Sequence, residues 1–159
     1  MVTYSDVSLM IDGAWTKGAN GRTIPVVNPA TEEVIGTVAH AEKADLDRAL
    51  AAADKGFRAW RKVSPFDRYK VMRKAAELIR QRVDEIAPIM TMEQGKPLSE
   101  SRGEIGYGAS FIEWFSEEAK RVYGDTIPAQ APDKRIVVIK QPIGVCAAIQ
   151  VSSPFSEKD

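Results

Sequence analysis

The sequence predicts an α/β fold, and three observations carry this prediction. Short apolar runs separated by turn signals fill the first forty residues, which is typical of β-hairpins. From Lys43 to Tyr123 apolar residues recur every three or four positions, the period of amphipathic helices. Residues 145–149 then form a short, wholly apolar run, as in a strand buried on both faces of a parallel sheet.

Hairpin signals come first along the chain. Asp12 and Gly13 form a strong two-residue turn signal directly after the apolar run 9–11. Two further candidate strands, 24–27 and 34–38, follow on either side of a break rich in turn-forming residues. The first forty residues are therefore expected to hold short antiparallel strands.

The second helix of the helical region has a clear start. Ser64 supplies a side-chain cap, Pro65 suits the first helical position, and Asp67 complements the positive end of the helix dipole. We expect one apolar face and one basic face on this helix. Its basic residues are Arg68, Lys70, Arg73, Lys74, Arg80 and Arg82.

Two more helices are expected to follow. Asp84 is placed to cap the third, and Gly95 to end it in a left-handed turn. The fourth is expected to run from Leu98 to Tyr123, with Gly124 as its stop. Three glycines inside it predict tight packing of the helix backbone against a neighbour, or else room for a substrate channel. They are Gly103, Gly106 and Gly108.

The last part of the chain predicts two strands. The β-branched run 136–139 reads as a strand, and Pro142 confines it to an edge or a bend. The run 145–149 is expected to be a buried strand, and Cys146 within it a buried structural cysteine. Residues 150–159 have no periodicity and are expected to form a disordered tail.

Composition excludes several function classes. The 159 residues carry 22 basic and 22 acidic side chains, whereas nucleic-acid and anionic-membrane partners favour a basic excess. No apolar run approaches the ~20 residues of a membrane span, and the first residues do not resemble a secretory signal. One cysteine and one histidine cannot build a closed zinc site, so no metal is expected. A single cysteine also fits a reducing cytoplasm.

Few residues are candidates for a catalytic role on the basis of the sequence alone. His40, the only histidine, is expected to be a surface residue. Glu113 and Glu117 lie one helical turn apart, with Glu118 beside them, and paired carboxylates can do acid–base work. The simpler interpretation is an acidic face that meets the basic face of the second helix. No Gly-x-Gly-x-x-Gly follows a strand, so local chemistry shows no complete active site.

Several longer segments carry a family resemblance over roughly residues 9–149. They include Ile11-Asp12-Gly13-Ala14-Trp15, Val27-Asn28-Pro29-Ala30-Thr31, Glu93-Gln94-Gly95-Lys96-Pro97, Phe111-Ile112-Glu113-Trp114-Phe115, Tyr123-Gly124-Asp125-Thr126-Ile127-Pro128 and Ile143-Gly144-Val145-Cys146. Together they resemble the N-terminal region of the aldehyde dehydrogenase superfamily. The resemblance is strongest to its succinate-semialdehyde or glutarate-semialdehyde dehydrogenase branch.

The resemblance implies a fold. Residues 1–149 would form a partial N-terminal cofactor-binding domain, built from β-hairpins, a helical layer and the first strand of an incomplete Rossmann-like sheet. That first strand would be 145–149, with Ile149 near the cofactor. The strand 135–141 resembles the family's oligomerisation element. The long helix would border the substrate tunnel through Tyr107, Phe111 and Trp114.

The resemblance also implies an activity. Family members oxidise an aldehyde to a carboxylic acid with NAD or NADP, using a nucleophilic cysteine, a glutamate that activates water, and an oxyanion-binding asparagine. Ser153 occupies that asparagine position here, and Cys146 does not match the nucleophile's motif. The nucleophile, the glutamate and most of the cofactor site are absent from this chain. We therefore expect no catalytic residue in it, no bound cofactor and no activity alone.

Two alternatives stay open. One is a piece of a split enzyme, completed by a second chain that carries the missing cysteine. The other is a non-catalytic assembly module that uses the strand 135–141 to join a partner's sheet. In every case the unpaired run 145–149 predicts exposed apolar surface, and hence self-association or pairing with aldehyde dehydrogenase subunits. The sequence leaves NAD and NADP equally open.

Overall fold

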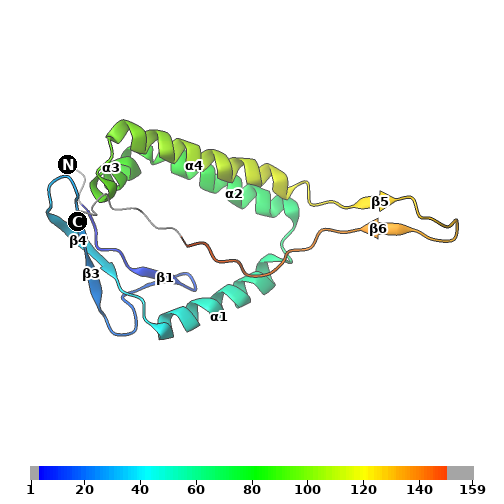
Figure 1. Cartoon of the computed structure of the whole chain (residues 1–159), viewed down its shortest axis with the longest axis horizontal. Coiled ribbons are helices and arrows are strands. Elements are labelled where there is room, and N and C mark those ends of the chain that lie inside the picture. The colour runs from blue at the N-terminus through cyan, green and yellow to red at the C-terminus, as the bar shows by residue number, and fades with distance from the viewer. Residues whose placement is uncertain (1–3, 150–159) are drawn as a thin grey trace, which may run out of the picture.

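The computed structural model describes residues 4–149. Three antiparallel hairpins, each a separate two-stranded sheet, accompany four helices in this part of the chain (Figure 1). The elements are β1 (Leu9–Ile11), β2 (Ala14–Thr16), β3 (Thr23–Val27), β4 (Val34–Ala39), α1 (Lys43–Trp60), α2 (Pro65–Gln81), α3 (Val83–Gln94), α4 (Leu98–Ala119), β5 (Asp125–Ile127) and β6 (Ile136–Val138).

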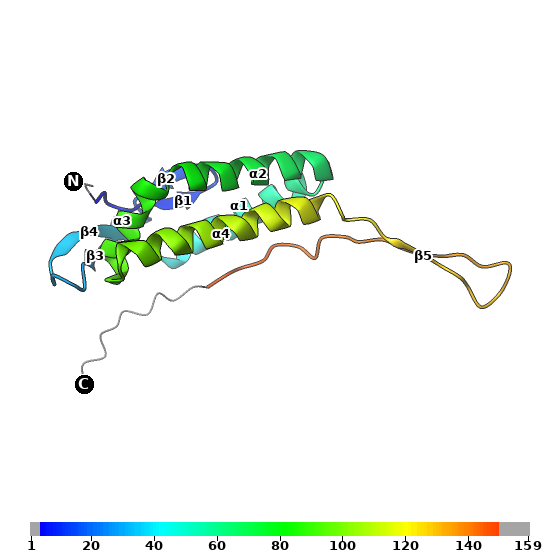
Figure 2. The ribbon, with the colours of Figure 1, turned by 90° about the horizontal axis from the view of Figure 1, so that it is seen from above.

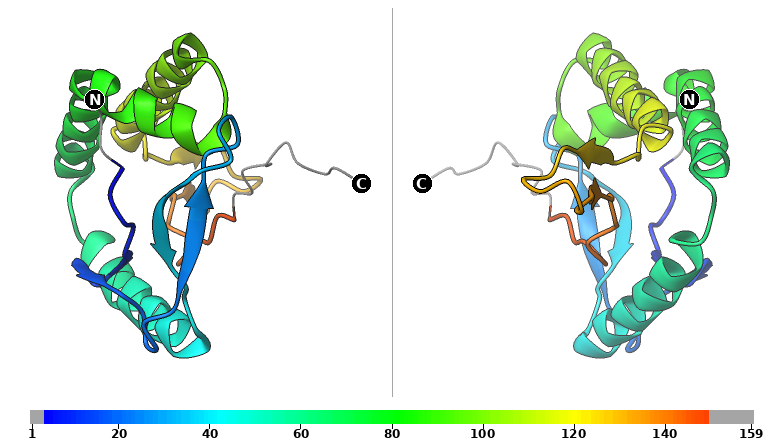
Figure 3. Two further views of the ribbon diagram at one scale, coloured as in Figure 1. Left: turned by 90° about the vertical axis from the view of Figure 1, so that its left-hand side faces the viewer. Right: turned by 90° about the vertical axis from the view of Figure 1, so that its right-hand side faces the viewer.

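The helices lie in two groups, with strands between them (Figure 1). In Figure 1, α2, α3 and α4 form one layer, and α1 lies apart from them on the other side. Strands β3 and β4 span the distance between α1 and that layer, as both views of Figure 3 show. The hairpin β5–β6 projects away from the rest, which is plain in Figures 1 and 2. None of the helices in residues 4–149 is both long and apolar enough to cross a membrane.

The first two hairpins confirm the strand predictions. Asp12 and Gly13 both have positive φ angles, 49° and 79°, as a two-residue hairpin turn of the favoured twist requires. The register places Leu9 opposite Thr16. Strands β3 and β4 pair from Thr23 opposite Ala39 onward. Ahead of β1, the backbone of Val7 bonds to β4 through Thr37 O and Ala39 N, both at 2.8 Å.

The start of α2 also agrees with its prediction, but the start of α3 does not. The Ser64 Oγ accepts the Asp67 N–H at 3.1 Å, and Pro65 is the first helical residue. The prediction that Asp84 caps α3 is wrong, because α3 begins at Val83. Arg82 alone separates the two helices and its N–H still bonds to carbonyls of α2, so no break exists for Asp84 to cap.

Helix α4 is shorter than expected. It ends at Ala119 instead of Tyr123, and the N–H groups of Lys120 and Arg121 bond three residues back, which tightens the last turn. Gly124 is therefore not the helix stop. An added Cβ there lies only 1.6 Å from the Val138 carbonyl oxygen, so Gly124 is required by the close passage of the chain against β6.

The core lies between α2, α3 and α4 and is made of small residues. Ala76, Ala87 and Ala109 are fully buried, and Ile105 is nearly so. Two buried hydroxyls are satisfied within the layer: Ser101 shares a 2.8 Å hydrogen bond with Thr91, and Ser116 donates to the Glu113 carbonyl at 2.6 Å. Small side chains allow the helix axes to approach closely, so the layer is compact with little apolar volume.

The three glycines of α4 do not pack as predicted. A Cβ added at Gly103, Gly106 or Gly108 meets no atom within 4 Å, within the residues that the structure describes. The close contact uses the neighbouring stripe that contains Ser101, Ile105 and Ala109 instead. Room for a substrate channel, the other interpretation of these glycines, stays a prediction.

The last described residues contain one predicted strand and lack the other. β6 confirms the strand expected at 136–139, and it pairs with β5 from Ile136 opposite Ile127. The prediction of a buried strand at 145–149 is wrong, because this segment has no strand partner among residues 4–149, and Ile149 is 94% exposed. An apolar run is buried as a strand only where neighbouring strands flank it. The expected tail, 150–159, lies outside the described residues.

Candidate functional site

A groove of about 470 Å³ opens along α4, where that helix meets α2 and α3. Its walls are mostly apolar side chains, and Glu104 is the charged residue among them. Residues from the three helices contribute, including Ile79, Ile86, Met90, Ile105, Tyr107, Gly108, Phe111 and Ile112. A concave, apolar surface with few polar groups is typical of a site for a small organic molecule.

Aromatic side chains form a stripe along this face of α4. Tyr107 and Phe111 pack edge to face, with ring centroids 4.6 Å apart and planes at 79°. Trp114 follows at the next helical turn, and Tyr107 and Trp114 are both about two-thirds exposed, at 65% and 66%. The structure therefore brings Tyr107 and Phe111 together at the groove and places Trp114 beyond its lining. Their contact with a substrate stays a prediction.

Glu113 lies on a different side of α4, toward α2. Its carboxylate accepts hydrogen bonds from the guanidinium groups of Arg73 and Arg80. The hydrogen bond from Arg80, followed by the charges of both arginines, lowers the pKa of Glu113. Burial opposes this effect only in part. The acidic face of α4 thus meets the basic face of α2, which confirms the simpler of the two interpretations of the glutamates.

Glu117 and Glu118 are also engaged in ion pairs. Lys120 Nζ lies 2.6 Å from Glu117 Oε2, and Arg121 Nη1 lies 2.6 Å from Glu118 Oε1. The hydrogen bond from Lys120 lowers the pKa of Glu117. A general acid near neutral pH needs a raised carboxyl pKa, and the environments of Glu113 and Glu117 lower the pKa instead. The helix therefore offers no acid–base pair here.

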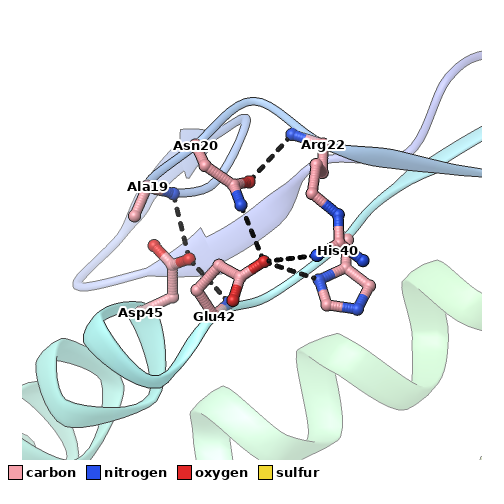
Figure 4. A network of polar contacts seen from close by, with 6 residues as sticks. All are labelled: Ala19, Asn20, Arg22, His40, Glu42 and Asp45. Atoms are coloured by element: carbon pink, nitrogen blue, oxygen red, sulfur yellow. Dashed lines mark hydrogen bonds and ion pairs between the residues drawn. The ribbon is translucent and has the colours of Figure 1, made fainter.

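A polar network joins the N-terminus of α1 to the loop between β2 and β3 (Figure 4). Asp45 is buried, and it accepts the N–H groups of Ala19 and Glu42, both at 3.0 Å, as well as a hydrogen bond from Arg48. The backbone bonds, that from Glu42 first, lower the pKa of Asp45. Glu42 and Asp45 form the capping box of α1.

His40 belongs to this network rather than to the open surface. Its side chain is 31% exposed, and Nδ1 lies 3.3 Å from Glu42 Oε1. The same carboxylate oxygen accepts Asn20 Nδ2 at 2.7 Å and Arg22 Nη1 at 3.2 Å (Figure 4). The expectation of a surface histidine is thus wrong in part. The hydrogen bonds from Asn20 and Arg22 to Glu42 fix the loop, whereas His40 Nδ1 lies near this carboxylate without a hydrogen-bond partner among the described residues.

Tyr4 contacts Glu93, which belongs to the Glu93–Pro97 segment. The Tyr4 hydroxyl donates a hydrogen bond to Glu93, and the Tyr4 ring lies against Gly36, where a Cβ would come within 2.5 Å of it. Burial, followed by the hydrogen bond to Glu93, raises the pKa of Tyr4 to about 12. This N-terminal contact ties β4 to the end of α3, and nothing in the sequence pattern signals it.

Cys146 does not have the predicted environment. It is exposed, not buried, because the segment around it lies in no sheet. Its only hydrogen-bonding contact in the described part of the chain is a weak one to the Gly144 carbonyl, at 3.9 Å. A nucleophilic thiol needs a nearby cation, base or helix N-terminus to stabilise the thiolate. Exposure alone does not make Cys146 such a group.

Ile149, the residue expected near the cofactor, is not brought into a site by the described residues, and Ser153 is the residue expected at the oxyanion asparagine position. Ile149 projects into solvent, and Ser153 lies outside the described residues. Within residues 4–149 no group of three or more His, Cys, Asp or Glu side chains gathers as metal ligands would. The described residues thus provide an apolar groove and structural polar contacts around Glu42, Glu93 and Glu113.

Comparison with known proteins gives a consistent picture. The model of the aldehyde dehydrogenase family matches residues 15–155. The glutarate-semialdehyde dehydrogenase of Pseudomonas aeruginosa is 56% identical over 139 residues, and the NADP(+) succinate-semialdehyde dehydrogenase of Escherichia coli is 48% identical over 140. These alignments cover 87% and 88% of this chain. The chain spans only 29% of the length of either relative.

The solved structures agree with the sequence relatives. The succinate-semialdehyde dehydrogenase from Burkholderia pseudomallei superimposes with a TM-score of 0.85 at 46% identity, over 88% of this chain and 29% of that one. The helical layer and hairpins described above thus match the N-terminal part of that fold. The prediction of fold class is confirmed.

Proposed function

Because the chain belongs to the aldehyde dehydrogenase family, we propose that it is the N-terminal segment of a semialdehyde dehydrogenase. The activity proposed for the whole protein is the oxidation of an aldehyde that carries a carboxylate, such as glutarate or succinate semialdehyde, to the dicarboxylic acid with NAD or NADP. One observation carries this proposal: 56% identity to a glutarate-semialdehyde dehydrogenase, sustained over 87% of the chain.

The role that we propose for α4 is to form one wall of the substrate site. The groove along this helix is apolar, and Tyr107 and Phe111 present a paired aromatic surface to it. Such a wall suits the methylene chain of a short semialdehyde, because it removes apolar carbon from water without a polar partner. Trp114 extends the same aromatic stripe by one turn.

The described residues do not fit a nicotinamide cofactor by themselves. A dinucleotide needs a strand that leads into a helix N-terminus, where backbone N–H groups receive the pyrophosphate. Residues 139–149 contain no strand, so they do not form the first part of such a site. We therefore assign no hydride-transfer step to these residues. The 159 residues are proposed to be inactive alone.

A chimera tests the proposed activity. Residues 11–149 of this chain replace the matching segment of the Pseudomonas aeruginosa relative, and reduction of NAD and of NADP is followed with glutarate and succinate semialdehyde. The expected result is turnover with at least one semialdehyde, because the exchanged segments share their fold. A chimera that folds and assembles but oxidises neither semialdehyde contradicts the proposal. The relative with its own segment is the positive control.

A second candidate is a non-catalytic assembly module, and the hairpin β5–β6 favours it. This hairpin projects from the body and exposes apolar side chains, with Val137 at 66% and Ile139 at 67%. Its outer edges have no partner strand among residues 4–149, so it can extend the sheet of another subunit. Mixed oligomers with a full-length relative that lack activity favour this function, whereas active mixed oligomers favour a split enzyme.

A further inference from the structure

The ring of His40 carries a nitrogen that is buried and unpaired. Its Nδ1 is shielded from solvent and has no hydrogen-bond partner within residues 4–149. Glu42 Oε1 lies 3.3 Å from this nitrogen, which is within ion-pair range but out of line for a hydrogen bond (Figure 4). A buried polar atom without a partner is unfavourable, so the neutral ring is poorly satisfied where it lies.

Protonation changes what this nitrogen can do. A neutral imidazole has one N–H and an imidazolium has two, so Nδ1 of the charged ring is always a donor. Glu42 Oε1 is already close to it, and a charge-assisted hydrogen bond is stronger than a neutral one. Histidine is the side chain that ordinarily gains its charge between about pH 5 and 8. His40 is the only histidine of the 159 residues.

The same carboxylate oxygen holds the loop 17–22 to the start of α1. It accepts Asn20 Nδ2 at 2.7 Å and Arg22 Nη1 at 3.2 Å, and Glu42 is the N-cap residue of α1. The backbone N–H of His40 also bonds to the Arg22 carbonyl at 2.9 Å, so the ring is tied to the loop that it faces. We propose that His40 and Glu42 form a pH-sensitive latch. The imidazolium binds Glu42 and tightens the loop onto α1, whereas the neutral ring lets the loop loosen.

The charges of the loop and of α1 permit this latch. Arg22 repels a charged ring, but its side chain is 63% exposed and solvent screens the repulsion. The ring of His40 is 31% exposed, so its contact with Glu42 is screened less. Asp45, whose pKa is lowered by the N–H groups of Glu42 and Ala19, stays negative throughout this pH range and favours the imidazolium.

Charged groups on the neighbouring elements have partners of their own. They lie on the segment beside β4, in the first turn of α1 and at the end of α3. The pairs are Asp6 with Thr37, Lys43 with Asp47, and Glu93 with Tyr4. Glu42 is therefore the acceptor that the charged ring meets.

Hydrogen exchange in the full 159-residue chain tests the latch. Protection factors of the loop 17–22 are compared at about pH 5.5 and 7.5, on either side of the ordinary histidine titration, with the amides of α4 as the internal reference. The loop should be protected about threefold more at the lower pH, as a partly exposed charged contact provides. His40→Gln, which stays neutral, should remove this difference. The matched control Lys43→Gln removes an exposed charge of α1 outside the latch and should keep it.

Two results overturn the proposal: equal protection of the wild-type loop at both pH values, or a pH difference that persists in His40→Gln. Nitrogen-15 spectra of the wild-type chain give a second reading, which decides the matter even where His40→Gln does not fold. The side-chain amide signals of Asn20 should shift with pH in step with the ring nitrogens of His40, because both groups share Glu42. Asn20 signals that do not follow the ring overturn the latch.

Discussion

The carboxylate of Glu113 on α4 is bound by the guanidinium of Arg80 on α2, 33 residues earlier in the chain. Arg73, two turns before Arg80, reaches the other oxygen of the same carboxylate. This contact joins the two helices whose small side chains make the core, so an ion pair supports a layer that has little apolar volume. The same contact removes Glu113 from acid–base chemistry.

Substitution of Glu113 by Gln should loosen the α2–α4 contact. Two arginines then lose their common charged acceptor at a position where Glu113 is 30% exposed. We expect the melting temperature to fall by several degrees in a thermal scan. Glu118→Gln is the control, because its partner Arg121 lies on the same helix, and it should shift the melting temperature by about a degree or less. Equal effects of the two substitutions contradict the account.

Because of Asp45, the folding stability of the chain should depend on pH in the acid range. Its pKa is lowered in the folded chain, chiefly by the N–H groups of Glu42 and Ala19. The stability that it contributes is therefore fully present above its ordinary pKa of 3.8 and is lost as the pH falls through the lower, folded value. Asp45→Asn should flatten the acid limb of a stability–pH profile measured by chemical denaturation, and an acid limb that keeps its slope contradicts this role of Asp45.

The same Asp45→Asn substitution should release the loop between β2 and β3. The neutral amide is a weaker acceptor for the Ala19 N–H than the carboxylate. Hydrogen exchange should therefore quicken at Ala19 and in the neighbouring loop while the amides of α4 keep their protection. Unchanged exchange at Ala19 contradicts the role assigned to the network.

Two glycines should respond to alanine with opposite signs. Gly124→Ala places a methyl group against the backbone oxygen of Val138, so it should destabilise the chain by roughly 2 kcal/mol or force β6 away. Gly103→Ala adds a methyl group in open space within a helix, and it should stabilise the chain by about 0.5–1 kcal/mol. Chemical denaturation of both variants measures the difference. A destabilising Gly103→Ala shows that the described residues pack more tightly at this point than the structure indicates.

Cys146 should react with a thiol reagent in the native chain at a rate close to that in denaturant. The residue is exposed, and no element covers it within residues 4–149. Protection of the thiol by more than about tenfold contradicts this exposure, and shows that the segment 145–149 has found a partner.

The sequence predicts best those features that are encoded locally. The turn at Asp12 and Gly13 and the cap at Ser64 need only neighbouring residues, and both are present. The apolar run 145–149 needs strands from elsewhere, so its composition alone does not make it a buried strand. The missed start of α3 has a local cause, because a single residue, Arg82, joins it to α2.

For the same reason, the sequence predicts some contacts of the candidate site and not others. Tyr107, Phe111 and Trp114 share one face because their spacing follows the helical period, which sequence alone reveals. The Glu113 contact followed from the opposite charges of two helices. By contrast, the meeting of His40, Asn20 and Arg22 at Glu42 depends on how a loop folds back onto α1. The three-residue spacing of Glu42 and Asp45, which is that of a capping box, is the one signal in the sequence for this network.

The most direct test of the central claim is nicotinamide reduction, measured side by side for the purified 159-residue chain and for the chimera that carries residues 11–149 in the Pseudomonas aeruginosa relative. Glutarate and succinate semialdehyde are offered to each with NAD and with NADP. The chimera should reduce the nicotinamide cofactor, and the 159-residue chain alone should not. A folded chimera that is inert contradicts this prediction, as does turnover that scales with the concentration of the isolated chain and vanishes in Cys146→Ser.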